Sequence, residues 1–173
     1  MLFRSDLGGI ALVPSPEGMV LGWMDARGIP YFRDLSGSRN LTSFTHEPRK
    51  RGFALGNLDR VDQWDLVATG EPTWSWWNFP GEGDHPAELK ISNSIKDVAI
   101  ADLNGDGAQD VVAAYNLLGG SLPPAELSYN QGQRQLSEPV LFPGEAWGHA
   151  FDVTLVDVNQ DGSLDAYFCK DRK

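Results

Sequence analysis

The chain has 173 residues and a formal net charge of −10, with 41% hydrophobic and 22% charged residues. This composition is typical of a globular domain with a core of its own. The negative charge argues against nucleic acid and anionic membrane surfaces as partners, and no run approaches the ~18 apolar residues that membrane insertion requires. The single cysteine, Cys169, excludes an internal disulfide.

The N-terminal part of the chain predicts a short β-hairpin. Two β-rich runs, Val20–Met24 and Ile29–Phe32, flank a turn-forming segment at 25–28. Further along the chain, similar pairs of strands are joined by an acidic loop. We interpret this hairpin as the same element in a degenerate first unit, in which the acidic loop has been lost.

Three later segments align without gaps, and each reads as a strand, an acidic loop and a second strand. They are residues 53–67, 98–112 and 153–167. Their starts lie 45 and 55 residues apart, a spacing that fits one four-stranded blade of a β-propeller per segment. The pattern predicts an all-β fold built from similar units.

Further β-rich runs follow the first two of these hairpins and predict a third and a fourth strand in each unit. They are Trp74–Phe79 and Glu88–Ser92, then Leu127–Gly132 and Gln135–Phe142. The last hairpin has few residues after its second strand in this chain. We expect its outer strands to come from the N-terminal strands, from another chain, or from a continuation of the native protein.

The chain is therefore expected to form one all-β domain, a partial or short β-propeller of about three to four four-stranded blades, with calcium-binding loops between the inner strands. Its expected units are a degenerate blade at 1–50, a blade with a degraded loop at 51–95, a blade with a calcium loop at 96–145, and a half blade with a calcium loop at 146–173.

Two of the acidic loops place side-chain oxygens at positions 1, 3, 5 and 9 and glycine at position 6. Ca²⁺ takes about six to eight oxygen ligands, which alternate residues of a tight loop can supply, and glycine permits the sharp turn. The carbonyl of position 7 would add another oxygen. We expect two Ca²⁺ sites, formed by Asp102, Asn104, Asp106, Ala108 and Asp110, and by Asp157, Asn159, Asp161, Ser163 and Asp165.

These loops have two other interpretations. The EF-hand needs a glutamate at position 12 and flanking helices, whereas position 12 is Ala113 or Phe168 and the flanks are β-rich. A solvated Asp/Asn/Gly turn without metal is the simpler alternative, but three aspartates within nine residues would repel one another there.

The loop of the first aligned segment, residues 57–65, departs from the pattern. Val61 stands at position 5, Arg60 adds a positive charge, and position 6 is not glycine. We expect this third loop to keep its fold and to bind calcium weakly or not at all, through Asn57, Asp59, Gln63 and Asp65.

The Asp-x-Asn-x-Asp-Gly-x-x-Asp loops and the run at 127–132 resemble FG-GAP and VCBS repeats over residues 52–168. Such repeats build the β-propellers of integrin α-subunits, cartilage-acidic-protein-like proteins, some lectins and many bacterial surface proteins. The resemblance implies calcium ligation by the Asp and Asn residues of the two loops. It also implies an extracellular, cell-surface or periplasmic location rather than a cytoplasmic one, although the charges at Arg4 and Asp6 predict no signal peptide in this chain.

Aromatic residues suggest a second kind of site. Trp74, Trp77, Trp147 and His149 are candidates for binding a ligand such as a sugar ring. The alternative for Trp74 is that its side chain fills the space between blade sheets. No Ser/His/Asp order, Walker loop, HExxH or CxxC motif is present, so we do not expect an enzyme.

The function predicted from the sequence is a calcium-stabilised β-propeller module for recognition or assembly, mediating protein–protein interaction or adhesion. One alternative is a carbohydrate-binding lectin. Another is a structural subunit whose open blade is completed by another chain or by a second copy. The expected partners are a protein or a glycan, without nucleic acid binding or membrane insertion.

Overall fold

The computed structural model describes residues 10–15, 18–24, 30–35, 40–41, 50–58, 64–70, 74–79, 87–89, 95–115, 125–132, 135–142 and 150–170. These residues form fourteen β-strands and no helix, so the predicted all-β class is confirmed. In the same ranges there is no helix with the length and apolar character that crossing a membrane requires.

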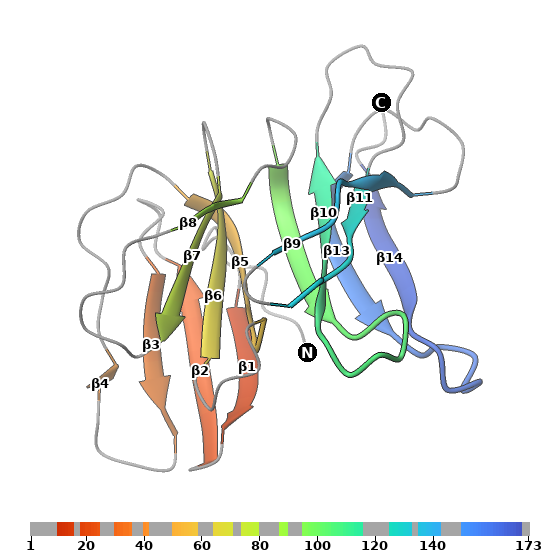
Figure 1. Ribbon diagram of the computed structural model, residues 1–173. Helices are drawn as coiled ribbons and strands as arrows, with labels where there is room; N and C mark the ends of the chain where they lie inside the picture. Colours follow the sequence, from red (N-terminus) through yellow and green to blue (C-terminus); the bar gives the residue numbers. More distant parts are fainter. Residues whose placement is uncertain are drawn as a thin grey trace.

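Consecutive strands form four antiparallel sheets, three of four strands and one of two (Figure 1). The first sheet contains β1 (Ile10–Ser15), β2 (Gly18–Met24), β3 (Pro30–Asp34) and β4 (Asn40–Leu41). The second contains β5 (Lys50–Gly56), β6 (Trp64–Gly70), β7 (Trp74–Phe79) and β8 (Ala87–Leu89). The third contains β9 (Ile95–Ala101), β10 (Asp110–Tyr115), β11 (Ala125–Ser128) and β12 (Val140–Leu141), and the last contains β13 (Ala150–Val156) and β14 (Asp165–Lys170).

Successive sheets contact one another through their first strands. Strand β1 contacts β5, β5 contacts β9, and β9 contacts β13. The third sheet therefore lies between the second sheet and the β13–β14 pair (Figure 1).

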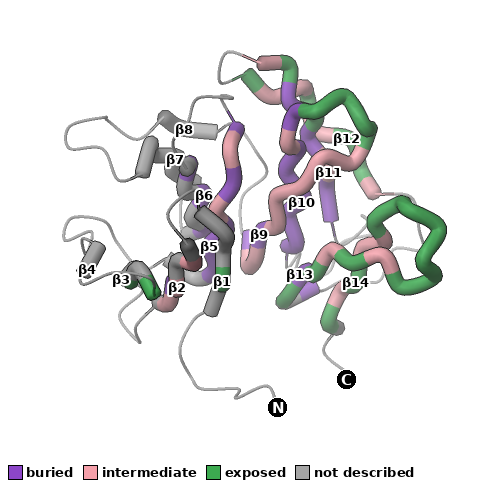
Figure 2. The backbone as a smooth tube through the Cα atoms, turned by 90° about the horizontal axis from the view of Figure 1, so that it is seen from below, coloured by how far each residue is buried: buried purple, intermediate pink, exposed green. Residues whose placement is uncertain are grey.

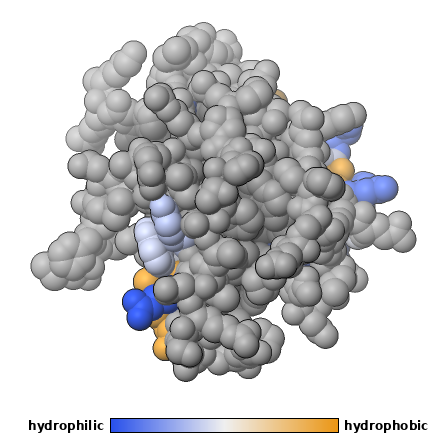
Figure 3. All heavy atoms as spheres, turned by 90° about the vertical axis from the view of Figure 1, so that its left-hand side faces the viewer, coloured by the Kyte–Doolittle hydropathy of each residue, from blue (hydrophilic) through white to orange (hydrophobic). Residues whose placement is uncertain are grey.

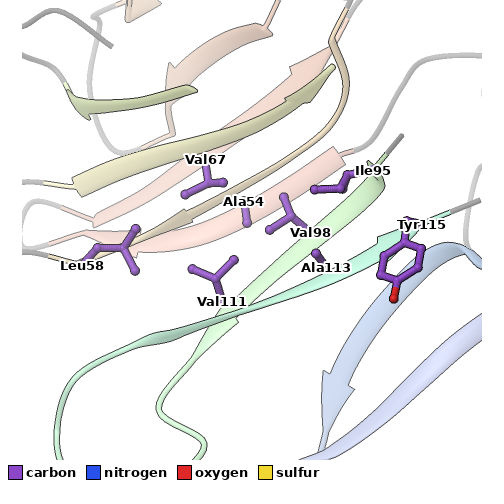
Figure 4. Packing of buried hydrophobic residues seen from close by; sticks show 8 residues of the cluster. All are labelled: Ala54, Leu58, Val67, Ile95, Val98, Val111, Ala113 and Tyr115. Atoms are coloured by element: carbon purple, nitrogen blue, oxygen red, sulfur yellow. The ribbon is translucent and has the colours of Figure 1, made fainter. Parts of the chain in front are cut away.

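Strand β10 is buried along its whole length because it has a neighbouring sheet on each side. Its alternate side chains Val111, Ala113 and Tyr115 belong to one core cluster and Val112 and Ala114 to another. The first cluster also contains Ala54, Leu58, Val67, Ile95 and Val98 (Figure 4). The second also contains Ala150 and Val153. Each buried valine contributes about 1.5–3 kcal/mol relative to an exposed one, so these clusters hold the three sheets together.

The hairpin predicted at Val20–Met24 and Ile29–Phe32 is present as β2 and β3, where Trp23 and Tyr31 stand opposite each other and stack at 5.5 Å. Its predicted place in the sheet was wrong. The other sheets begin with their loop-carrying hairpin, whereas here β1 comes first and β2–β3 is the second hairpin. Pro14 lies within β1, and proline is unusual in strands, which explains why the sequence pattern did not indicate this strand.

The outward side of the first sheet has a mixed surface. Leu12 in β1 and Leu35, just after β3, are exposed although they are hydrophobic. Seen from this side, the described surface shows hydrophobic and hydrophilic side chains next to one another (Figure 3).

A carboxyl pair links the third sheet to the last one. Asp97 of β9 accepts a hydrogen bond from the Val153 N–H at 3.1 Å and is hydrogen-bonded to the side chain of Asp152, both on β13. Burial, followed by the bond to Asp152, raises the pKa of Asp97 to about 8. Gly52 of β5 lies against the same carboxyl, and a Cβ there would collide with the Asp97 side chain. The neutral acid is therefore the form that fits between the strands.

We predict that Asp97 makes the protein less stable as pH rises. Between the ordinary pKa of 3.8 and about 8 the folded state holds a proton that the unfolded state has lost, so the free energy of unfolding falls as pH rises through this window. Asp97→Asn keeps an acceptor for Val153 and a donor for Asp152 without a charge. Its advantage over the wild type should grow with pH and reach about 1–3 kcal/mol at pH 8.

Urea denaturation of both proteins at a series of pH values and constant calcium measures this difference. Glu138→Gln, at an exposed carboxyl, is the matched control and should follow the wild type. Parallel curves for wild type and Asp97→Asn would contradict the prediction.

Candidate metal-binding loops

The two acidic loops connect β9 to β10 and β13 to β14, and both lie at the same end of their sheets (Figure 1). Residues 104–107 of the first loop and 158–164 of the second are exposed (Figure 2). Position 6 has a left-handed backbone in both, with φ of 82° at Gly107 and 88° at Gly162. This conformation is easily adopted only by glycine, which agrees with the expected role of these two residues.

Position 4 is also left-handed in both loops. It is Gly105 in the first, with φ of 75°, and Gln160 in the second, with φ of 61°. A non-glycine residue in this region stores about 1 kcal/mol or more of strain. Gly105 and Gln160 therefore have the same left-handed backbone conformation although only one is glycine. This indicates that contacts made by other residues of the loop determine its geometry.

Asp102, at position 1 of the first loop, binds the loop backbone with both carboxylate oxygens. Oδ1 accepts a hydrogen bond from the Gly105 N–H at 2.8 Å, and Oδ2 accepts one from the Gly107 N–H at 2.9 Å. The backbone N–H groups of positions 4 and 6 thus hold both oxygens of this carboxylate.

Positions 3 and 5 of the same loop make a second set of bonds. Asn104 Oδ1 accepts from the Asp106 N–H at 2.9 Å, and Asp106 Oδ1 accepts from the Ala108 N–H at 2.7 Å. The Asn104 amide also donates to Asp106 Oδ2 at 2.9 Å. These bonds place the two side chains next to each other on the turn.

The second loop has nearly the same contacts. Asp157 Oδ2 accepts from the Gly162 N–H at 2.9 Å. Asn159 Oδ1 accepts from the Asp161 N–H at 2.9 Å and Asp161 Oδ1 accepts from the Ser163 N–H at 2.8 Å. Equivalent positions in the two loops therefore have equivalent hydrogen-bond partners, except that Oδ1 of position 1 accepts from Gly105 in the first loop and from Asp161 in the second.

Asp161 is a charged group stabilised by its neighbours. The Ser163 N–H, and then the Asn159 amide that donates at 2.8 Å, hold the pKa of Asp161 below its usual range. This carboxylate is therefore ionised at neutral pH, as a cation ligand must be.

Position 9 closes all three acidic loops in the same way, because its carboxylate accepts a hydrogen bond from the N–H of position 2. The three donor–acceptor pairs are Leu58–Asp65 at 2.7 Å, Leu103–Asp110 at 3.0 Å and Val158–Asp165 at 3.1 Å. The degraded loop at 57–65 thus retains the closing contact.

Ca²⁺ fits the chemistry of these loops better than a softer metal does. Their side chains offer carboxylate and amide oxygens, which are the donors that hard cations prefer. A carboxylate oxygen that accepts one N–H bond keeps a further lone pair for a cation. Within the described ranges, however, no three His, Cys, Asp or Glu side chains are grouped closely enough to hold a metal ion by themselves. Ligation would need the asparagines and the backbone carbonyls of Ala108 and Ser163 as well.

Several of the predicted site residues lie outside the described residues. They are Asp59 and Gln63 of the third loop, and Trp147 and His149 among the aromatic candidates. Trp74 and Trp77 are placed in β7 by their backbone, but their side chains are not described. The ligand-binding role of these four aromatic positions stays a prediction.

Two residues that the sequence reasoning missed connect the loops. Gln109 Oε1 accepts a hydrogen bond from the Asn57 N–H at 2.6 Å, and the Asn130 amide donates to the Leu58 carbonyl at 2.7 Å. Gln109 is position 8 of the first calcium loop, which the motif leaves unspecified, and Asn130 follows β11. No sequence signal links residues that are 52 and 72 positions from their partners.

No protein-family model matches this sequence, and a search of curated proteins found no significant match.

Proposed function

We propose that this protein is a calcium-stabilised β-sheet module of the β-propeller type that serves recognition or assembly and not catalysis. The observation that supports this most is the shared hydrogen-bond pattern of loops 102–110 and 157–165. In both, positions 1, 3 and 5 are bound to the loop backbone in a way that gathers oxygen donors on one short turn.

Each loop would hold one Ca²⁺. The ligands would be Asp102, Asn104, Asp106, the Ala108 carbonyl and Asp110 in the first, and Asp157, Asn159, Asp161, the Ser163 carbonyl and Asp165 in the second. The cation would neutralise the negative charge of the turn and fix the two strands that the turn connects. Its role is structural, because these loops lie at the ends of hairpins whose strands form the cores between sheets.

The order of the sheets supports the propeller type. Three consecutive sheets are four-stranded meanders, and successive sheets contact one another through their first strands. Blades of a propeller would have this strand order and these contacts. The likeness of the loops to FG-GAP and VCBS repeats points the same way. Modules of that kind act outside the cytoplasm and bind proteins or glycans, so we propose an extracellular, cell-surface or periplasmic location and a protein or glycan partner.

Titration calorimetry tests the metal sites directly. The wild type should bind two equivalents of Ca²⁺, and Asp106→Ala and Asp161→Ala should each bind one, because each substitution removes a central ligand from one loop. Glu138→Gln, which removes a charge outside the loops, should still bind two. Unchanged stoichiometry in both loop variants would show that the loops are not the sites.

A further inference from the structure

Loops 57–65 and 102–110 belong to different sheets, yet side chains of the third sheet bind the first of these loops directly. Gln109 Oε1 accepts the Asn57 N–H at 2.6 Å, and Asn130 Nδ2 donates to the Leu58 carbonyl at 2.7 Å. Positions 1 and 2 of loop 57–65 are therefore both held from the neighbouring sheet. Gly56 makes room for this, because a Cβ there would lie 2.6 Å from Gln109 Oε1.

Asn130 binds both loops at once. Its backbone N–H donates to Asp110 Oδ1 at 2.8 Å, and its side-chain amide donates to the Gln109 carbonyl at 2.9 Å as well as to Leu58. Its Oδ1 accepts from the Gly132 N–H at 2.8 Å. Asn130 is only 6% exposed, and its amide N–H groups and its oxygen are all used. A buried side chain with every bond made is fixed in position, so a shift of one loop is transmitted to the other.

Loop 157–165 lacks this connection in the part of the chain that the structure describes. Its position 8 is Leu164, which has no side-chain oxygen and is 42% exposed. Among the described residues, its closing residue Asp165 accepts a hydrogen bond from Val158, whereas Asp110 accepts from both Leu103 and Asn130. Among the described residues, loops 57–65 and 102–110 are therefore linked, and loop 157–165 is separate from them.

We propose that Gln109 and Asn130 couple the two linked loops, so that cation binding by loop 102–110 stabilises the hydrogen bonds made by Asn57 and Leu58 at the start of loop 57–65, while loop 157–165 binds independently. This inference rests on the proposed function. Gln109 lies between two of the proposed ligands, the Ala108 carbonyl and Asp110, so a bound cation would restrain its backbone. The restraint reaches Asn57 through the Gln109 side chain and Leu58 through Asn130. Loop 57–65 would then respond to calcium without binding it.

Amide exchange measured by NMR on the full chain, with Ca²⁺ and with chelator, tests the coupling. In the wild type, Ca²⁺ should slow exchange of the Asn57 and Leu58 amides by about tenfold, the size expected for two hydrogen bonds that strengthen together. In Gln109→Ala the slowing at Asn57 should disappear, and in Asn130→Ala the slowing at Leu58 should disappear, while calorimetry still shows two bound equivalents. Leu164→Ala, the substitution at the same position of the separate loop, should leave the slowing intact.

Asp106→Ala and Asp161→Ala show which loop must bind Ca²⁺ for amide exchange to slow at Asn57 and Leu58. The slowing at Asn57 and Leu58 should be lost in Asp106→Ala and kept in Asp161→Ala. The coupling would be overturned if the wild type bound two equivalents without any slowing. It would also be overturned if the slowing persisted at Asn57 in Gln109→Ala and at Leu58 in Asn130→Ala. Either result would leave the proposed function unaffected. Absence of calcium binding would overturn both.

Discussion

Calcium should raise the melting temperature of this protein by about 10–20 °C. A ligand that binds only the folded state at about 100 times its dissociation constant adds about 2.7 kcal/mol per site, so two sites add about 5 kcal/mol. For a chain of this size each kcal/mol corresponds to about 2–4 °C. Calorimetric or circular dichroism melting curves in Ca²⁺ and in chelator measure the shift.

Two controls separate binding at the loops from a general effect of divalent cations on an acidic chain. The net charge of −10 gives any cation some screening effect, and Mg²⁺ at the same concentration measures it. The double variant Asp106→Ala/Asp161→Ala should respond to Ca²⁺ no more than to Mg²⁺. If wild-type melting were equal in calcium and chelator, calcium would not be a structural component of the folded protein.

Strands with a clear local pattern could be predicted from the sequence. Trp74–Phe79 was expected as a strand and is present with these bounds as β7. The second strand expected in segment 98–112 is present as β10, Asp110–Tyr115. Both are rich in β-branched, aromatic or small apolar residues and are bounded by turn-forming segments. The β propensity of their residues agrees with their position in a sheet. A strand for which the two agree can be predicted from the sequence alone.

Outer strands were predicted with less accuracy. Gln135–Phe142 was expected as one strand, but the ladder of β12 covers only Val140–Leu141, and Leu136 makes an isolated bridge to Asn130. Strand β12 is at the edge of its sheet, and both of its residues are exposed. Because an edge strand has a partner on one side only, its length depends on the turn before it more than on its own residues.

The positions of the loop ligands followed from the motif, but the contacts between sheets did not. Asp102, Asp106 and Asp110 are separated by a few residues, so their spacing restricts where they can lie. Asn130 reaches Leu58 across 72 residues and Asp97 reaches Val153 across 56. Such contacts depend on how the sheets stack, which is set by the packing of whole sheets and leaves no local pattern in the sequence.

Asp110→Ala should destabilise the protein by about 3–5 kcal/mol even without metal. Asp110 is fully buried and accepts hydrogen bonds from the N–H groups of Leu103 and Asn130 at 3.0 Å and 2.8 Å. Alanine would leave both donors without an acceptor, and each buried, unsatisfied group costs about 1–3 kcal/mol. Urea denaturation in the presence of a chelator measures this loss with no contribution from calcium.

Asp165→Ala provides the matched comparison, since Asp165 occupies the same position of the separate loop. It accepts one bond, from the exposed Val158 at 3.1 Å, and water can replace the lost acceptor there, so the expected loss is about 1 kcal/mol or less. The two aspartates are identical in the motif and differ only in the second donor that Asn130 supplies and in burial. Equal losses in the two variants would mean that the bond from Asn130 contributes little. That result would also weaken the case for Asn130 as the residue that joins the two linked loops.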